Sequence, residues 1–284
     1  MTHNSAEWVG RAARSWQGGQ VVVADSGSVD GTVAAVERLW PTARTVLCGD
    51  VGFGTAANRG MKELSADWVA VSNPDVAFVE NCSSEMMRAI QEAPPEVAVL
   101  APQLLNADGT IQPSVGRFPT LWSVVRDHWR PRERRKYCFP QPTTKTDIEW
   151  ATGACLLFRR QAFKAVGGFD EKFFLYGEEV DLQRRMHDAG MKIVFVPEAK
   201  VTHFQPNAIR EPRPEVQRWA ARGQLRHFAK HGGLGTLWGY RLMALLSGRL
   251  DADEAMASRK AILARGTGDA ERQASPSIAR IIED

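Results

Sequence analysis

The sequence predicts an α/β fold, in which helices cover a central sheet, because strand, turn and helix follow one another repeatedly. The Val-rich run Gln20 to Ala24 has the length of a buried strand, and the polar turn 25–32 and a helical spacing of apolar residues follow it. Strand-length runs also occur at 44–47 and 68–72, each with a polar turn after it. This alternation is typical of an open α/β sheet.

The bulk composition excludes several classes of protein. The 284 residues are 44% hydrophobic, which is ample for a packed core, and the net charge of +3 is too mild to favour a nucleic-acid partner. No apolar run approaches the roughly 20 residues that span a bilayer, and a signal-peptide core is lacking, so a membrane substrate would be met from the inner face. Four cysteines without metal-site spacing favour a reduced, cytoplasmic protein: Cys48, Cys82, Cys138 and Cys155.

The first polar turn, 25–32, is a candidate nucleotide site. Turns at the carboxyl ends of strands are where open α/β sheets bind nucleotides, and Asp25 can accept a hydrogen bond from a base or ribose. The alternative is an ordinary turn in which Asp30 or Ser28 caps the following helix.

The glycine-rich segment 49–60 does not fit a dinucleotide fingerprint. Gly52 and Gly54 are followed by Ala57 where Gly-x-Gly-x-x-Gly requires glycine, which excludes a Rossmann dehydrogenase. After strand 68–72 the chain turns at Asn73-Pro74-Asp75, because proline cannot extend a central strand. Asp75 is thereby placed at the sheet's carboxyl edge, where it can bind a hard divalent cation.

The alternation of strands and helices continues into the middle of the chain and then ends. Residues 81–92 read as a helix, 97–101 as a buried strand and 106–109 as a turn that closes a hairpin. From 117 to 149 we expect a long loop or short helices. The cations of its basic cluster either bind an anionic substrate or are solvated: Arg126, Arg130, Arg132, Arg134, Arg135 and Lys136.

An acidic helix follows the short strand expected at 153–158. Glycines at 167 and 168 break the chain, and helical spacing runs from Glu178 to a stop at Gly190. Glu178, Glu179 and Asp181 fall in its first turn, where they either complement the helix dipole or form a site wall. Because an aromatic cluster precedes them, one of these carboxylates can be tuned as a general base.

The last third combines strands and helices. Two short strands are expected at 192–196 and 200–204, the second carrying His203, which is either structural or part of a site. Helical patterns return beyond Pro214. The apolar segment 234–246 either lies on a membrane or packs against the domain, and 251–284 is charged and helical at best.

Taken in order, these motifs resemble the family-2 glycosyltransferases of the GT-A fold, and within them the bacterial rhamnosyltransferase-like branch. The resemblance covers residues 1–235 and leaves 236–284 as a helical extension, partly disordered. It implies a mixed, mainly parallel sheet flanked by helices. It also implies an inverting transfer of rhamnose or a related deoxysugar from a dTDP- or UDP-sugar to a hydroxyl. The implied acceptor is a cell-envelope or polyprenyl-diphosphate-linked glycan.

The resemblance also implies a metal and donor site. Asp75 matches the metal-contacting aspartate of the family's Asp-x-Asp motif, Asn73 replaces the first aspartate, and His203 completes a site for Mg²⁺ or Mn²⁺ and the diphosphate. Asp25 resembles the residue that recognises the pyrimidine. Further residues match the walls of the nucleotide-sugar pocket: Asp30, Gly52, Gly54 and Asn58.

The catalytic base implied by the resemblance is Glu179. The family has an aspartate here, and the extra methylene moves the carboxylate by about an ångström. Glu178 and Asp181 are the alternative bases. The resemblance otherwise implies that they support the acceptor side of the site, together with Trp150 and Gly153.

The N-terminus differs from the family pattern. Thr2-His3-Asn4 looks like the end of a central strand whose first half is missing, so we expect residues upstream of Met1 or a truncated, less stable domain. The short start, together with the departures from the family pattern at Asn73 and Glu179, motivates an alternative. In this alternative the chain is a non-catalytic GT-A protein that binds a nucleotide-sugar or a protein partner.

Overall fold

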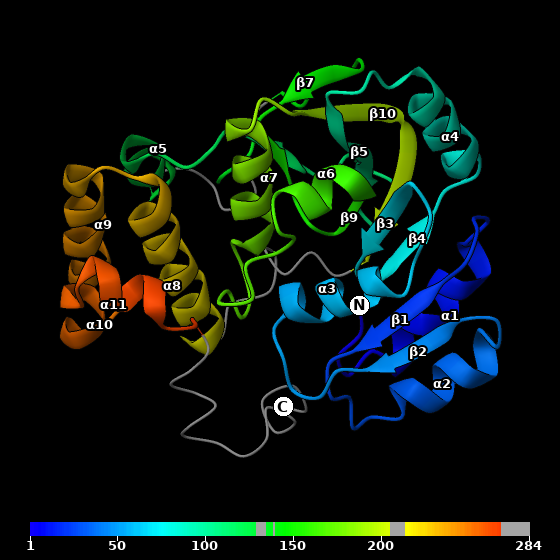
Figure 1. The fold of residues 1–284 in the computed structure, drawn as a ribbon, viewed down its shortest axis with the longest axis horizontal. Helices are drawn as coiled ribbons and strands as arrows, with labels where there is room; N and C mark the ends of the chain where they lie inside the picture. The colour runs from blue at the N-terminus through cyan, green and yellow to red at the C-terminus, as the bar shows by residue number, and fades with distance from the viewer. Residues whose placement is uncertain (129–134, 139, 205–213, 268–284) are drawn as a thin grey trace.

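A six-stranded mixed sheet forms the centre of the computed structural model, which describes residues 1–128, 135–138, 140–204 and 214–267 (Figure 1). The main strand order is β3 (Trp68–Ser72), β9 (Cys155–Arg159), β5 (Val97–Leu105), β10 (Lys192–His203) and β4 (Val76–Phe78). The sixth strand, β7 (Thr146–Ile148), pairs with β10 outside this order. The α/β class and the mixed sheet are confirmed. Within the described part of this sheet, β3, β5 and β10 run in the same direction, and β9 lies between β3 and β5 antiparallel to both, so that its one parallel ladder joins β5 and β10.

A parallel pair, β1 (Val22–Asp25) and β2 (Arg44–Leu47), forms a second sheet at the N-terminal end. The first residues join it to the central sheet: the Thr2 amide donates to Ala24, and the Met1 nitrogen donates to the Ser72 carbonyl at 3.0 Å. Residues 1 and 2 therefore occupy the place expected of a strand between β1 and β3. Residues upstream of Met1 stay a prediction.

Helices cover the sheets where their apolar spacing predicts. The flanking helices are α1 (Ala6–Ser15), α2 (Thr32–Leu39), α3 (Phe53–Lys62), α4 (Cys82–Glu92), α6 (Arg160–Ala165) and α7 (Glu178–Asp188). On α7, Leu182 and Met186 are fully buried one turn apart and pack in a core with Phe158 and Phe195 of the sheet. The acidic start of α7 is thereby held against the sheet. Two small strands, β6 (Val115–Gly116) and β8 (Trp150–Ala151), pair beside it.

The two strands expected at 192–196 and 200–204 are one strand, β10. The ladder with β5 shifts register between Val196 and Lys200 instead of ending. Pro197 lies in this interval, and since proline has no N–H to donate, a bulge there keeps the strand continuous. The continuation carries His203 to the far end of the strand.

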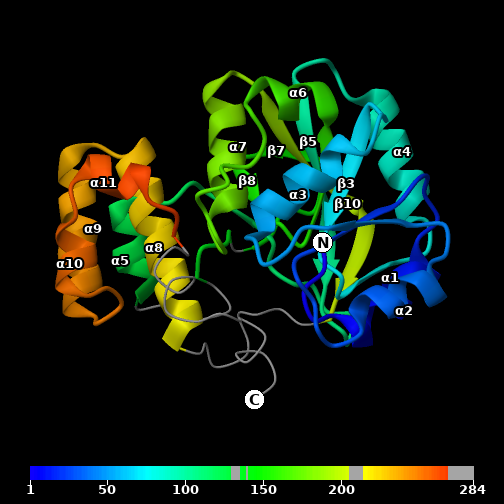
Figure 2. The same ribbon diagram turned by 60° about the horizontal axis from the view of Figure 1, so that its bottom comes forward.

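A group of helices stands beside the sheets, with its own apolar core (Figures 1 and 2). It contains α5 (Leu121–His128), α8 (Pro214–His231), α9 (Leu234–Leu246), α10 (Ala252–Met256) and α11 (Arg259–Ala264). The expected boundary at residue 235 falls inside α9, because α8 packs with the helices that follow it. Residues 130–134 and 268–284 lie outside the described residues. Among the described helices, none combines the length and apolar content that a bilayer crossing requires.

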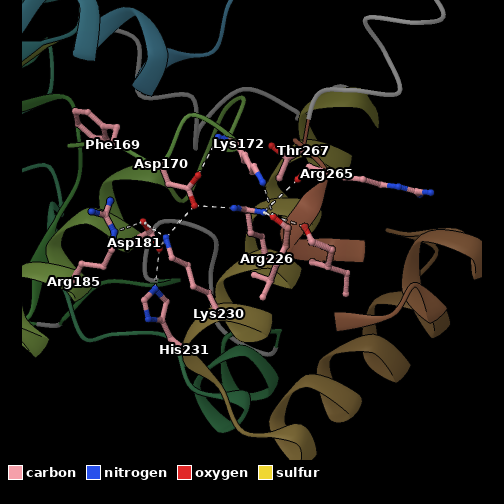
Figure 3. Close-up of polar contacts among 12 residues, drawn as sticks. Phe169, Asp170, Lys172, Asp181, Arg185, Arg226, Lys230, His231, Arg265 and Thr267 are labelled. Carbon is pink, nitrogen blue, oxygen red and sulfur yellow. Dashed lines mark hydrogen bonds and ion pairs between the residues drawn. The ribbon is translucent and has the colours of Figure 1, made fainter. Parts of the chain in front are cut away.

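Ion pairs centred on Asp181 connect this helical group to α7 (Figure 3). The Asp181 side chain is fully buried, and it accepts from Arg185 at 2.8 Å, Lys230 at 3.0 Å and His231 at 2.8 Å. Burial alone would raise the pKa of Asp181, but the His231 hydrogen bond and the charges of Arg185 and Lys230 hold it well below its usual range. Lys230 also contacts Asp170 at 2.9 Å.

We expect Asp181→Asn to lower the free energy of unfolding at neutral pH by about 3–5 kcal/mol, because it leaves buried cations without their carboxylate. The folded-state pKa is depressed, so this stabilisation is complete above the unfolded-state value and is lost as the pH falls below about 4. Urea denaturation at several pH values measures it. Asp188→Asn is the matched control, since Asp188 forms an exposed pair with Arg184 on the same helix. Equal losses in the two variants would contradict the assignment.

Candidate active site

A cavity of about 1170 Å³ lies between the ends of the strands, the start of α7 and the helices α5 and α8. Residues predicted from sequence for different roles line it together: Asn73, Trp150, Gly153, Glu178, Glu179 and His203. Its volume exceeds the range of about 300–1,000 Å³ that is typical of small-ligand pockets. The cavity can therefore hold two reactants at once.

The residues predicted to bind a metal converge at one side of this cavity. His203 Nε2 lies 3.4 Å from Asp75 Oδ2 and 3.5 Å from Asn73 Nδ2. Asp75 ends the turn after β3, His203 ends β10, and the antiparallel pairing of β10 with β4 brings them together. Within the described ranges, no three His, Cys, Asp or Glu side chains gather as a metal cluster.

The donor set nevertheless fits a divalent ion. Two ligands of one such ion lie about 3 Å apart, close to the separation of His203 Nε2 and Asp75 Oδ2. His203 Nδ1 is 2.9 Å from Gln112 Oε1, so the amide oxygen accepts the Nδ1 proton and leaves Nε2 as the lone-pair donor. Gln112 is buried, and no sequence motif pointed to it.

Glu178 and Glu179 share a poorly solvated site at the start of α7. Burial, and then the charge of Glu179, raises the pKa of Glu178 well above its ordinary value, and Glu178 Oε2 is buried with no hydrogen-bond partner among the described residues. Burial also raises the pKa of Glu179, against the opposing effects of its backbone hydrogen bonds and Lys136. Glu178 is the more buried of the two and has an unpartnered oxygen, so the site disfavours its charge more than that of Glu179.

The chain before α7 is bent to place these carboxylates. Tyr176 and Gly177 have φ of +70° and +97°, a left-handed pair that ends the preceding loop. Gly223 of α8 lies against this turn, since a Cβ there would come within 2.2 Å of the Tyr176 carbonyl oxygen. Only glycine allows α8 to approach this closely.

Trp150 and Gly153 line the cavity together with Glu179, and Gly153 lies directly beside the Glu179 side chain. An added Cβ on Gly153 would contact the Glu179 side chain at 3.4 Å, and the Trp150 indole donates to the Arg117 carbonyl at 2.7 Å. Gln183 bonds both backbone groups of Ala151 and so ties β8 to α7. Gln183 was not predicted from the sequence.

Lys136 and Tyr137 are further residues that the sequence did not single out for this site. Lys136 has φ of +70°, and its amide donates to Asp127 at 2.7 Å. Its ammonium charge lowers the pKa of both glutamates. Burial and the charge of Glu179 raise the pKa of Tyr137 to about 12, which keeps the phenol protonated beside the base. Both belong to the predicted basic segment, but sequence did not show that it folds back onto α7.

Other predicted site residues have structural partners in this arrangement. Asp25 is buried and accepts from Thr2 at 2.8 Å and from Ser28, while Asp30 accepts from the amides of Ala6 and Thr32. Gly31 stands at the N-cap position of α2, instead of Asp30 or Ser28.

The glycines and Asn58 contact the loop that leads to α7. A Cβ on Gly52 would meet Phe174, a Cβ on Gly54 would meet Phe169, and Asn58 bonds both backbone groups of Phe169. Asp181 faces the ion pairs with α8. None of these side chains lines the cavity, so their roles toward a donor or acceptor stay predictions.

The mixed sheet with a cavity at its strand ends agrees with the GT-A fold, and the comparisons with known proteins establish the class. The family model for glycosyl transferase family 2 matches residues 2–167, and one described as the N-terminal domain of galactosyltransferase matches residues 133–207. The chain belongs to glycosyl transferase family 2.

Several curated proteins are similar to this chain. The N-acetylglucosaminyl-diphospho-decaprenol L-rhamnosyltransferase of Mycobacterium tuberculosis is 35% identical over 208 residues, covering 66% of this chain and 67% of that protein. The rhamnosyltransferase WbbL of Escherichia coli is 23% identical over 164 residues, covering 58% of this chain and 62% of that one. Enzyme relatives of this kind do not favour the non-catalytic alternative.

Solved structures share the fold. A mannosyltransferase from Pyrobaculum calidifontis in complex with GDP-Man and Mn²⁺ matches with a TM-score of 0.54 and 19% identity, over 97% of this chain and 79% of that one. S. aureus TarS 1-349 in complex with UDP-GlcNAc matches with a TM-score of 0.53 and 15% identity, over 85% of this chain and 77% of that one. At these identities the likeness confirms the GT-A fold.

We expect Glu178→Gln to raise the melting temperature at pH 8 by several degrees and to change it little near pH 4.5. The folded-state pKa of Glu178 is raised, so the wild-type protein loses stability as the pH rises from the ordinary value of 4.5 through the folded value. The amide removes this loss. Thermal denaturation across pH measures it, with Glu198→Gln on the exposed side of β10 as control. A pH-independent difference would contradict the shared-proton arrangement.

Proposed function

We propose that this glycosyltransferase transfers rhamnose or a related deoxysugar, with inversion, from a dTDP- or UDP-sugar to a hydroxyl of a lipid-linked glycan in cell-envelope synthesis. The observation that carries the proposal is a single cavity that presents Glu179 on one side and Asn73 and His203 on another. The names of the mycobacterial and E. coli relatives support the sugar and the lipid-linked acceptor. Action at the cytoplasmic face of the membrane is part of this proposal.

Glu179 acts as the base in this reaction. Its half-buried carboxylate accepts the proton of the acceptor hydroxyl as that oxygen attacks the anomeric carbon. Burial disfavours the charge of Glu178 more strongly, whereas the backbone hydrogen bonds of Glu179 and the charge of Lys136 oppose the rise in the pKa of Glu179 and so favour its ionised form. Trp150 and Gly153 orient the acceptor against this carboxylate.

The donor diphosphate lies toward Asp75 and His203. A Mg²⁺ or Mn²⁺ ion, which Asp75 and His203 would hold beside Asn73, would neutralise charge on the departing nucleoside diphosphate. Gln112 fixes the His203 ring for this role. Asp25 and the loop 25–32 supply the nucleotide side of the donor site.

We expect Glu179→Gln to lower kcat by about a hundredfold or more and to leave donor affinity nearly unchanged, because a base acts in the transition state. Release of nucleoside diphosphate from a panel of nucleotide-sugars, with a lipid-linked acceptor, measures this. Asp188→Asn on the same helix should turn over normally. Transfer by Glu179→Gln at the wild-type rate would exclude Glu179 as the base.

Glu179→Asp restores the carboxylate that the family carries at this position. The shorter side chain would draw the carboxylate back by about an ångström from the position that Glu179 gives it, so we expect kcat to fall by about tenfold. A rise in kcat would show that the base is better placed on the shorter side chain.

Asp75→Ala should weaken donor binding in the presence of Mn²⁺ by about tenfold or more, and should have little effect in EDTA, since it removes one ion ligand. Asn73→Asp should strengthen metal-dependent donor binding, because it adds a carboxylate at the same place. Calorimetric titration of the donor, with and without metal, measures both. Equal effects with and without metal would assign Asp75 a purely structural role.

A further inference from the structure

Helix α9 exposes an apolar face that nothing in the described structure covers. Its solvent-facing large apolar residues recur at helical spacing and have exposed fractions of 37–78%: Leu234, Trp238, Leu242, Leu245 and Leu246. The opposite face is buried against α8 and α10 through Leu237, Tyr240 and Ala244. A helix that is apolar on both faces is normally covered on both, so the outer face indicates an absent partner.

Helix α5 extends this face. Leu121 packs on α9 at Gly239, where an added Cβ would lie 2.4 Å from a Leu121 methyl carbon. The next residue, Trp122, is 72% exposed, and Val125 one turn on is 37% exposed. We call Trp122, Val125 and the five residues of α9 the α5/α9 face. It carries two tryptophans, which favour the boundary between lipid headgroups and acyl chains.

Cations flank the α5/α9 face on the side of the cavity. Arg126 follows Val125 on α5, Arg249 follows α9, and both line the cavity that contains Glu179. Arg241 stacks beneath Trp238 at 4.7 Å from its ring, but it is buried and donates to the Ala257 carbonyl, so it is not one of these flanking cations. The acidic residues of α10 are at its start, where Glu254 pairs with Arg222. An apolar surface bordered by arginines is complementary to an anionic bilayer.

We propose that the α5/α9 face docks on an anionic lipid bilayer, with the side chains of α9 and Trp122 entering the headgroup region. This rests on the proposed function, because a lipid-linked acceptor would then extend from the bilayer past Arg126 and Arg249 into the cavity. At about 1.5 Å per residue, the 13 residues of α9 span about 20 Å along the membrane surface.

Co-sedimentation with phosphatidylglycerol vesicles, without donor or acceptor, tests the docking. We expect the wild-type protein to bind, and the triple variant Trp122→Ser, Leu242→Ser, Leu246→Ser to bind at least about tenfold more weakly, because three exposed apolar side chains no longer insert. Met87→Ser and Leu39→Ser, which remove exposed apolar residues of α4 and α2, serve as controls and should bind like wild type.

Several outcomes would overturn the docking proposal: no binding by the wild-type protein, equal binding by the triple variant, or binding that high salt abolishes completely. Wild-type dimers that the triple variant does not form, seen by analytical ultracentrifugation, would assign the face to a second copy instead. Transfer to a water-soluble acceptor analogue distinguishes the two proposals. Vesicle binding without any transfer contradicts the proposed function alone, whereas transfer without vesicle binding contradicts the docking alone.

Discussion

The buried ion pairs of Asp181 are the constraint on which the site depends. Residues two apart on an α-helix point about 200° away from each other, so Asp181 faces α8 when Glu179 faces the cavity. The contacts with Lys230 and His231 therefore fix the rotation of α7 as well as the position of the helical group. Because α8 also lines the cavity, the same contacts place two of its walls.

One helical turn holds three carboxylates in different electrostatic environments. The cations around Asp181 lower its pKa and favour its ionised form, whereas burial and the neighbouring Glu179 raise the pKa of Glu178 and favour its protonated form. Glu179 lies between these extremes, half-buried and within the field of Lys136. The surroundings thus assign each residue a different chemical task, although the sequence presents them as one acidic run.

The sequence predicted the parts of the fold that depend on local pattern. The strands at 44–47 and 68–72 and the helix from Glu178 were confirmed within a residue or two, because apolar spacing and glycine stops determine them. Strand direction could not be predicted, since the pairing of β9 with β3 depends on the path of the whole chain. The domain boundary expected at residue 235 stays a prediction, and the apolar side of α8 alone gives no indication of the core in which it packs.

The candidate site residues likewise differ in whether the sequence alone can reveal them. The convergence of Asn73, Asp75 and His203 could be expected from their places at strand ends and from the family resemblance, while their role stays a prediction. Gln112, Lys136 and Gln183 could not, because each acts through contacts with residues far away in the sequence, and each belongs to no motif. Asp25 and Asn58 were identified by position, but the structure shows that their polar atoms are engaged by the protein itself.

Because the helical group has its own core, polar contacts are needed to hold it against the rest of the protein. These contacts include the ion pair of Asp170 with Arg226 and the hydrogen bond that Lys172 donates to the Leu263 carbonyl. Asp170 and Arg226 are largely buried, and salt screens buried pairs much less than exposed ones. The contacts that position the helical group against the sheets, and with it one wall of the cavity, therefore resist changes in ionic strength.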